Sequence, residues 1–143
     1  MQRVRSDDGS TLPLVIFFGF LSIALVLMVA AATSLYLERK RLFTAADGAA
    51  LAGAEAYDLD AVATGPTGPH PTLDSEDVAA AVATYLAASP DRFESLVIEH
   101  AAAVDDASAT VTLSAYWRPP VLSLLAPDGF RIEVTAVGRT VFY

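Results

Sequence analysis

The feature that most constrains this chain is an apolar run from Leu12 to Leu37 that contains no charged residue. About 20 apolar residues in a helix are enough to cross the hydrocarbon core of a bilayer, which is roughly 30 Å thick. A buried helix of a soluble protein is rarely this long and free of charge. Tyr36 stands near the end of the run, where interfacial aromatic residues are enriched. The run therefore predicts a transmembrane helix over residues 12–37.

A cleaved secretory signal is the alternative interpretation of this run. Arg3 and Arg5 precede it, and the three alanines at 30–32 offer a cleavage site of the A-x-A kind. The apolar core of a signal peptide spans about 7 to 15 residues, however, and this one is longer. A basic cluster at residues 39–41 follows the run as stop-transfer residues do. We therefore expect an uncleaved signal-anchor.

Basic residues flank the run on both sides, so the positive-inside rule does not fix its orientation. A short tail is easily kept in the cytoplasm, whereas long acidic domains are translocated largely regardless of their charge. We expect residues 1–11 to form a short cytoplasmic tail and the C-terminal domain to be extracytoplasmic in a single-pass cell-membrane protein.

The charge of the distal part excludes some partners. From Glu55 onward there are 13 acidic and 4 basic residues, and the whole chain has a net charge of −8. Such a surface repels phosphate backbones, so nucleic acid is not expected as a partner. The chain has no cysteine, which excludes disulfides, thiolate metal sites and cysteine nucleophiles. Eight arginines against one lysine, with abundant alanine, suggest a GC-rich bacterial genome.

The helix is predicted to continue beyond the membrane as an alanine-rich juxtamembrane segment, residues 38–63, with helical structure to about Tyr57. Small residues recur on it at four-residue spacing, which lets another backbone approach closely. We predict a helix-packing interface formed by Ala45, Ala49, Gly53, Gly48 and Ala52. It could face the chain's own sheet or a partner subunit. The partner is favoured, because two helix-weakening glycines exceed what packing on one sheet requires.

Glycine and proline dominate residues 64–74, which are expected to form a linker or an ordered loop because these residues break regular structure. A helix should follow, capped by Asp74 or Ser75 and stopped by Pro90. Alternating apolar residues then predict one strand over 111–117.

Two further strands are expected beside this one. They cover residues 96–104 and 130–142, with turns at Asp105-Asp106 and at the Pro-Asp-Gly sequence of 127–129. The expected fold class is α+β: a long N-terminal helix, a second helix and a small antiparallel sheet of about three strands. Residues 75–143 would form the extracytoplasmic domain, and the chain from Glu55 onward should fold alone unless the alanine-rich helix supplies a wall of the core.

The polar residues show no catalytic pattern. Acid–base and metal sites need several convergent polar side chains. His70 and His100 lack a paired spacing, Asp105-Asp106 lies outside any EF-hand loop, and Asp47 is interpreted as a polar contact on the helix. We therefore predict no catalytic, cofactor-binding or metal residues, no cofactor and no small-molecule substrate.

The stretch between Pro119 and Pro127 is too apolar for an ordinary exposed loop. It contains Val121, Leu122, Leu124 and Leu125. Either these side chains fold over the core in a helical turn, which is the favoured interpretation, or they form an apolar loop that binds a partner.

Two motifs resemble a known family. Gly9-Ser10 precedes the apolar run, and residues 41–54 read RLFTAADGAALAGA. Over about the first 55 residues the chain resembles the TadE/TadG-like pilus-assembly proteins. The resemblance implies a pilin-like structural or assembly component of a tight-adherence (Flp-type) pilus or a related secretion apparatus. Its partners would be membrane lipid and other pilin-like or pilus-assembly subunits.

Two alternatives accompany this resemblance. A membrane-tethered extracytoplasmic binding module unrelated to pili is the second functional hypothesis, and neither hypothesis makes the chain an enzyme. Gly9 is a possible processing site, because cleavage in related pilins follows a glycine. Those pilins commonly carry glutamate five residues on, where this chain has Leu14, so Gly9 could equally mark the start of the helix.

Overall fold

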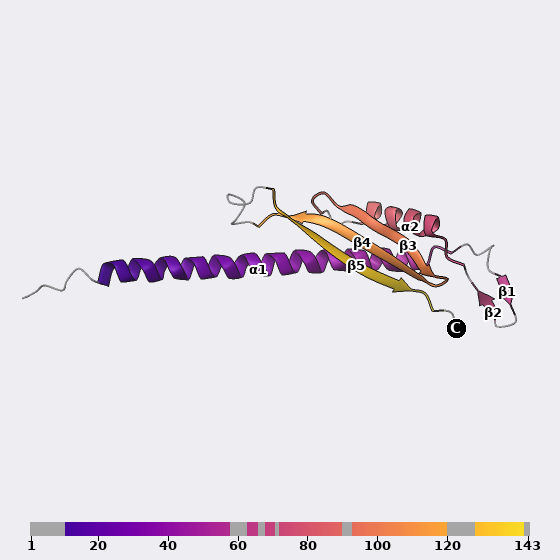
Figure 1. The fold of residues 1–143 in the computed structure, drawn as a ribbon, viewed down its shortest axis with the longest axis horizontal. Coiled ribbons are helices and arrows are strands. Elements are labelled where there is room, and N and C mark those ends of the chain that lie inside the picture. The colour runs from indigo at the N-terminus through magenta and orange to yellow at the C-terminus, as the bar shows by residue number, and fades with distance from the viewer. Residues whose placement is uncertain are drawn as a thin grey trace, which may run out of the picture.

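The computed structural model describes residues 11–57, 63–65, 68–70, 72–89, 93–119 and 128–141. The elements found among these residues are α1 (Thr11–Ala54), β1 (Ala63–Gly65), β2 (Gly68–His70), α2 (Ser75–Ala88), β3 (Val97–Asp105), β4 (Ser108–Trp117) and β5 (Phe130–Arg139). Figure 1 shows α1 as a long rod with β3, β4, β5 and α2 gathered along its C-terminal half. The predicted α+β class is confirmed.

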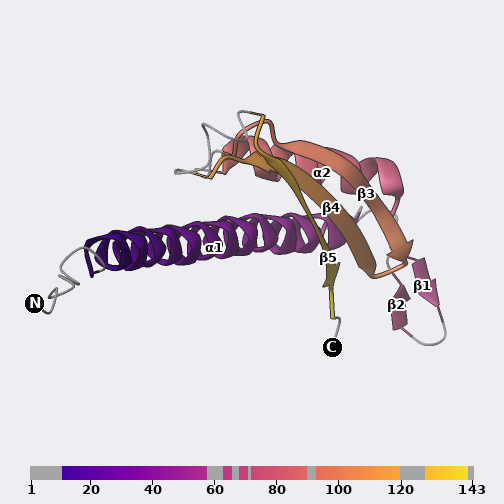
Figure 2. The same ribbon diagram turned by 60° about the vertical axis from the view of Figure 1, so that its left-hand side comes forward.

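α1 is one continuous helix of 44 residues, about 66 Å long at 1.5 Å per residue. The predicted transmembrane and alanine-rich segments are thus a single rod, which ends at Ala54. Its side chains are all exposed from Thr11 to Ala30, and this half projects away from the other elements (Figures 1 and 2). By length and composition α1 is able to cross a membrane, with a mean hydropathy of 2.8 in its most apolar window.

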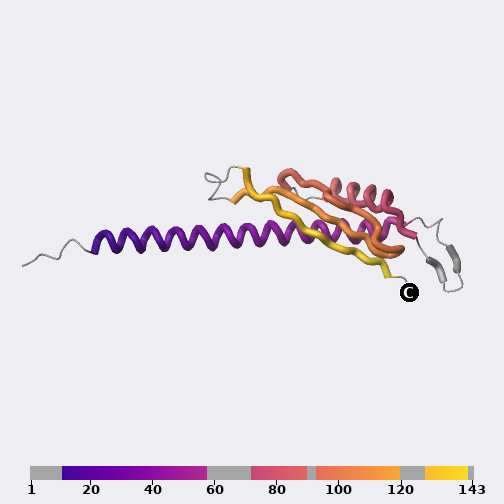
Figure 3. The backbone as a smooth tube through the Cα atoms, in the orientation of Figure 1, coloured from indigo at the N-terminus to yellow at the C-terminus, as the bar shows by residue number. Residues whose placement is uncertain are grey.

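The sheet is an antiparallel meander in the order β3-β4-β5, which Figure 3 shows as one chain running back and forth along α1. β4 and β5 pair without interruption, with Leu113 opposite Val134. The pairing of β3 with β4 shifts register between Ile98 and His100 and again near Asp105. The three strands predicted from the alternating pattern are therefore confirmed.

The two turns of the meander follow the predicted signals. Asp105 Oδ1 accepts a hydrogen bond from the backbone N–H of Ala107 at 2.9 Å, which closes the β3-β4 turn. Before β5, Gly129 has φ +70°, and a Cβ there would lie 2.8 Å from the carbonyl oxygen of Trp117. Glycine is required at this position because it alone combines that conformation with so close an approach.

Both helices cover the same face of the sheet. α1 contacts β4 and β5, whereas α2 contacts α1 and β3. α2 begins where predicted, since the side chain of Asp74 accepts a hydrogen bond from the backbone N–H of Glu76 at 2.7 Å. The core between these layers is made of small and branched residues, the largest fully buried ones being Leu42, Leu113, Val78, Val82 and Val111.

This core includes part of the segment that the sequence assigns to a separate juxtamembrane helix. Leu42, Ala46 and Ala50 of α1 have no exposed surface and belong to the same cluster as the inner face of the sheet. The last turns of α1 are therefore one wall of the folded unit.

Residues 64–74, for which no regular structure was expected, include β2 and all of β1 except its first residue, Ala63. These short strands pair antiparallel, with Thr64 opposite Pro69 and Gly65 opposite Gly68. Proline is compatible with this ladder because both strands of a two-stranded sheet are edge strands. The strands were not predicted because the glycines and prolines of this segment are typical of irregular structure.

Candidate functional site

The predicted small-residue strip lies inside the molecule. Ala45, Ala49 and Gly53 lie on α1 and are buried where this helix packs on α2 and the sheet. A Cβ at Gly53 would lie 3.0 Å from Val78 and 3.3 Å from Val82, so small size at this position lets the two helices approach closely. The favoured interpretation, in which a partner subunit covers this strip, is corrected for these three residues, because their surface is already buried within one chain.

Gly48 and Ala52 lie beside the strip and are half-buried. The phenol of Tyr85 on α2 covers Gly48 so closely that an added Cβ would overlap it. Gly48 therefore makes room for an aromatic ring of the same chain. A contact of Ala52 with another subunit stays a prediction.

The β4-β5 end of the sheet reaches the apolar half of α1. The indole N–H of Trp117 donates a hydrogen bond to Ser34 Oγ at 3.3 Å, and the ring of Phe130 lies 6.2 Å from that of Trp117. Ser34 belongs to the uncharged run. This end of the sheet is therefore level with the last turn of the predicted membrane segment.

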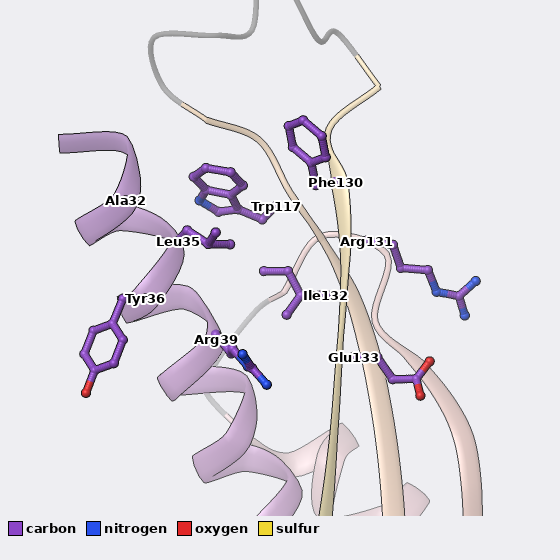
Figure 4. A pocket seen from close by; sticks show the side chains of 9 residues that line it. All are labelled: Ala32, Leu35, Tyr36, Arg39, Trp117, Phe130, Arg131, Ile132 and Glu133. Atoms are coloured by element: carbon purple, nitrogen blue, oxygen red, sulfur yellow. The ribbon is translucent and has the colours of Figure 1, made fainter. Parts of the chain in front are cut away.

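An open pocket of about 650 Å³ separates α1 from β5 at this end. It is lined by Ala32, Leu35, Tyr36, Arg39, Trp117, Phe130, Arg131, Ile132 and Glu133. In Figure 4, Leu35 and Ile132 face each other across the pocket and Arg39 extends into it from α1, whereas Arg131 and Glu133 point away from α1. The side chains that face this pocket are thus apolar apart from one cation. Sequence reasoning missed the pocket, since its two walls are distant in the chain.

A second, smaller pocket of about 310 Å³ adjoins the first and is lined by Tyr36, Arg39, Lys40 and Phe43. Among the residues that the structure describes, neither Arg39 nor Lys40 has a side-chain ion pair or hydrogen bond. Arg41 differs, because it pairs with Glu38 at 3.4 Å and its guanidinium lies 5.7 Å from the ring centre of Phe93. Within the basic cluster at 39–41, Arg41 thus has a structural role, whereas the positive charges of Arg39 and Lys40 are available to bind an anion.

The opposite face of the sheet carries a polar cross-strand network. Ser114 Oγ donates to Glu99 Oε1 at 2.5 Å, and the guanidinium of Arg131 contacts the same carboxylate and lies 3.0 Å from Ser114 Oγ. The hydrogen bond from Ser114, followed by the charge of Arg131, lowers the pKa of Glu99. A carboxylate held ionised in this way is a poor base for activating a serine. The network is suited to joining three strands.

The other polar residues singled out in the sequence lie apart from one another. His100 is exposed on β3 and Asp47 is exposed on α1. The backbone N–H of Ala107 lowers the pKa of Asp105, which acts as a turn residue. Within the described ranges, no three histidine, aspartate or glutamate side chains come close enough to hold a metal ion.

Several predicted positions lie outside the described residues. These are the possible processing site Gly9, the side chain of His70, and the apolar loop residues Val121, Leu122, Leu124 and Leu125. Their roles stay predictions.

Comparison with known proteins identifies the N-terminal part of the chain. Residues 9–56 match the Tad family, described as "Putative Flp pilus-assembly TadE/G-like". The resemblance inferred from the sequence is confirmed over this segment, and the family that it matches is described by pilus assembly and not by an enzymatic activity. No match was found among the curated proteins or among the solved structures.

Proposed function

We propose that this chain is a membrane-anchored, pilin-like structural or assembly subunit of a Flp-type pilus or a related secretion apparatus. One observation carries the proposal: the segment that matches the Tad family contains a helix whose side chains from Leu12 to Ala30 are all exposed and, apart from Ser22, apolar. So large an apolar surface is unfavourable in water. This surface fits the hydrocarbon core of a bilayer. It also fits contacts with neighbouring subunits once the chain enters an assembly.

The hydroxyl groups of this half of α1 support the membrane assignment. Ser22 donates to the carbonyl of Phe18 at 2.8 Å, and Thr33 donates to that of Val29 at 2.9 Å. Polar groups in a hydrocarbon core require such internal partners, because no water is present to replace them. These hydroxyls therefore impose little cost on insertion.

The location of the buried strip changes where other subunits would bind. Because Ala45, Ala49 and Gly53 pack inside the chain, contact between neighbouring pilin-like helices would use the exposed half of α1. Gly19 lies there with no atom within 4 Å of the position of an added Cβ, so it offers a place for close helix approach. Residues 1–11 would stay cytoplasmic, and the sheet with α2 would be extracytoplasmic.

Membrane topology can be tested with single cysteines, because the chain has none of its own. An impermeant maleimide applied to intact cells should label Ala87→Cys, on the exposed surface of α2, and should not label Ser6→Cys. The chain should also remain in the membrane after washing with carbonate. The opposite labelling pattern, or release of the chain by carbonate, would contradict the proposed anchoring.

Participation in a pilus requires a separate test in cells that assemble the pilus. A Gly19→Cys variant should cross-link to another pilus component, whereas Ala83→Cys on the exposed surface of α2 serves as the matched control. Deletion of the chain should abolish or shorten the pilus. Normal pili after deletion, with no cross-link at position 19, would favour the tethered binding module instead.

A further inference from the structure

We propose that the pocket between α1 and β5 binds an anionic phospholipid of the membrane in which α1 is anchored. The lipid groove, as we call it, consists of Leu35, Arg39, Trp117, Phe130 and Ile132. This inference rests on the proposed anchoring of α1 and adds a specific ligand to it. The acyl chain lies against the apolar walls, and the phosphate lies against Arg39.

The depth of the groove relative to the membrane supports a lipid as its occupant. Ser34, which holds the indole of Trp117, is four residues before Glu38, the first charged residue after the apolar run. Four residues of helix correspond to about 6 Å along its axis. The groove therefore lies where hydrocarbon gives way to headgroups, and tryptophan is enriched at this level of membrane proteins.

The apolar walls of the groove are continuous with the exposed apolar surface of α1. Leu35 is 37% exposed and Phe130 is 52% exposed, although both line the pocket. Figure 4 shows Leu35 and Ile132 on opposite sides and the rings of Trp117 and Phe130 at one end. An acyl chain beside α1 would enter this space without crossing a polar barrier. Burying these residues against lipid removes apolar surface from water.

The charge at the groove selects an anionic headgroup. Arg39 extends into the groove and has no partner within the described part of the chain, and Lys40 follows it in the adjoining pocket. The nearby carboxylates do not oppose an anion, since Glu133 points away from α1 and Glu38 pairs with Arg41. Arginine binds phosphate oxygens through two parallel hydrogen bonds, which makes it well suited to a phosphodiester.

Trp117 is the only tryptophan of the chain, so its fluorescence reports on the groove directly. The full chain would be reconstituted into vesicles that contain equal fractions of phosphatidylglycerol and phosphatidylcholine. In one preparation the acyl chains of phosphatidylglycerol carry bromine atoms. In the other preparation the acyl chains of phosphatidylcholine carry them. Brominated phosphatidylglycerol should quench Trp117 more strongly, with a local enrichment of about fivefold, the typical effect of one basic residue at a membrane surface.

Two variants that each remove one positive charge distinguish binding in the groove from a general electrostatic effect of the protein's charge on nearby lipids. Arg39→Gln should abolish the difference between the two brominated lipids. Arg139→Gln, at the far end of β5 and outside the groove, should retain it. Circular dichroism of both variants would show that the fold is unchanged. A loss of selectivity in both variants would overturn the assignment to Arg39.

The remaining outcomes distinguish this inference from the anchoring on which it rests. Equal quenching by both lipids, or no quenching, in a chain that resists carbonate washing would overturn the lipid site alone. Quenching that declines as the ratio of protein to lipid rises would show that a second copy of the chain fills the groove, and would also overturn it. A chain released by carbonate would overturn the anchoring and the lipid site together.

Discussion

Gly138 of β5 lies directly against the backbone of Ala50 in α1. A Cβ at Gly138 would overlap the carbonyl group of Ala50 and would lie 2.6 Å from the amide nitrogen of Leu51. Strand and helix thus meet backbone to backbone, without side chains between them. Because dispersion attraction depends steeply on distance, many short contacts compensate for the small apolar area of the alanines around them.

Replacement of Gly138 with alanine should therefore destabilise the fold, because the obstructing atoms belong to a helix backbone that cannot rotate away. We expect a loss of about 1 to 3 kcal/mol in the free energy of unfolding, as for other overpacked cores. Denaturant unfolding of the full chain in detergent micelles, followed by the fluorescence of Trp117, would measure it. The matched control is Gly19→Ala, where an added Cβ meets no atom within 4 Å. Equal free energies of unfolding for Gly138→Ala and Gly19→Ala would contradict the close contact between the backbones of Gly138 and Ala50.

Replacement of Ala49 with leucine tests the buried strip in the same way. Ala49 has no exposed surface, so the larger side chain must displace α2 or the sheet. The expected cost is again about 1 to 3 kcal/mol. Ala83→Leu, on the exposed surface of α2, should leave the thermal midpoint nearly unchanged. If Ala49→Leu melted normally but prevented pilus assembly, the strip would have to face a partner after all.

The sequence predicted those features that depend on local pattern. Period-two alternation located β4 and β5, and the capping preference of Asp74 located the start of α2. The uncharged run indicated a helix long and apolar enough to cross a membrane, and the motif at 41–54 indicated the family that residues 9–56 match. Each signal lies within one short segment, so no knowledge of tertiary structure was needed to read it.

Features that depend on the meeting of distant segments could not be predicted. Small residues suit a contact with a sheet of the same chain as well as a contact with a partner, and only the fold shows that Gly53 packs on Val78. The groove is formed because Trp117 reaches Ser34, 83 residues earlier in the chain. No pattern along the chain marks such a pair.

Acid should weaken the fold partly through Glu99. The pKa of Glu99 is lowered from its ordinary value of 4.5 in the folded chain, first by the hydrogen bond from Ser114 and then by Arg131. The ionised carboxylate therefore contributes stability above pH 4.5, and this contribution is lost as the pH falls through the lower folded-state pKa. Glu99→Gln should melt below the wild type at neutral pH, and the difference should vanish in acid.

The measurement is the thermal midpoint as a function of pH between about 3 and 7, the range over which carboxylates of this kind titrate. Asp105, whose pKa is also lowered, contributes in the same direction and remains in the variant. Some acid sensitivity should therefore persist. Parallel curves for the wild type and Glu99→Gln would show that the carboxylate adds no pH-dependent stability.

The last turns of α1 should be indispensable to the domain. A fragment of residues 55–143 lacks Leu42 and the alanines of α1 that close the core, so the apolar face of β4 and β5 would be open to water. We expect it to aggregate or to melt without cooperativity. A fragment of residues 38–143 omits the uncharged run but keeps this wall, and it should be soluble with a cooperative transition. Because it lacks Ser34, the near-ultraviolet signal of Trp117 should be weaker than in the full chain. Cooperative unfolding of the shorter fragment would show that α2 and the sheet suffice, and that α1 only attaches the domain to the membrane.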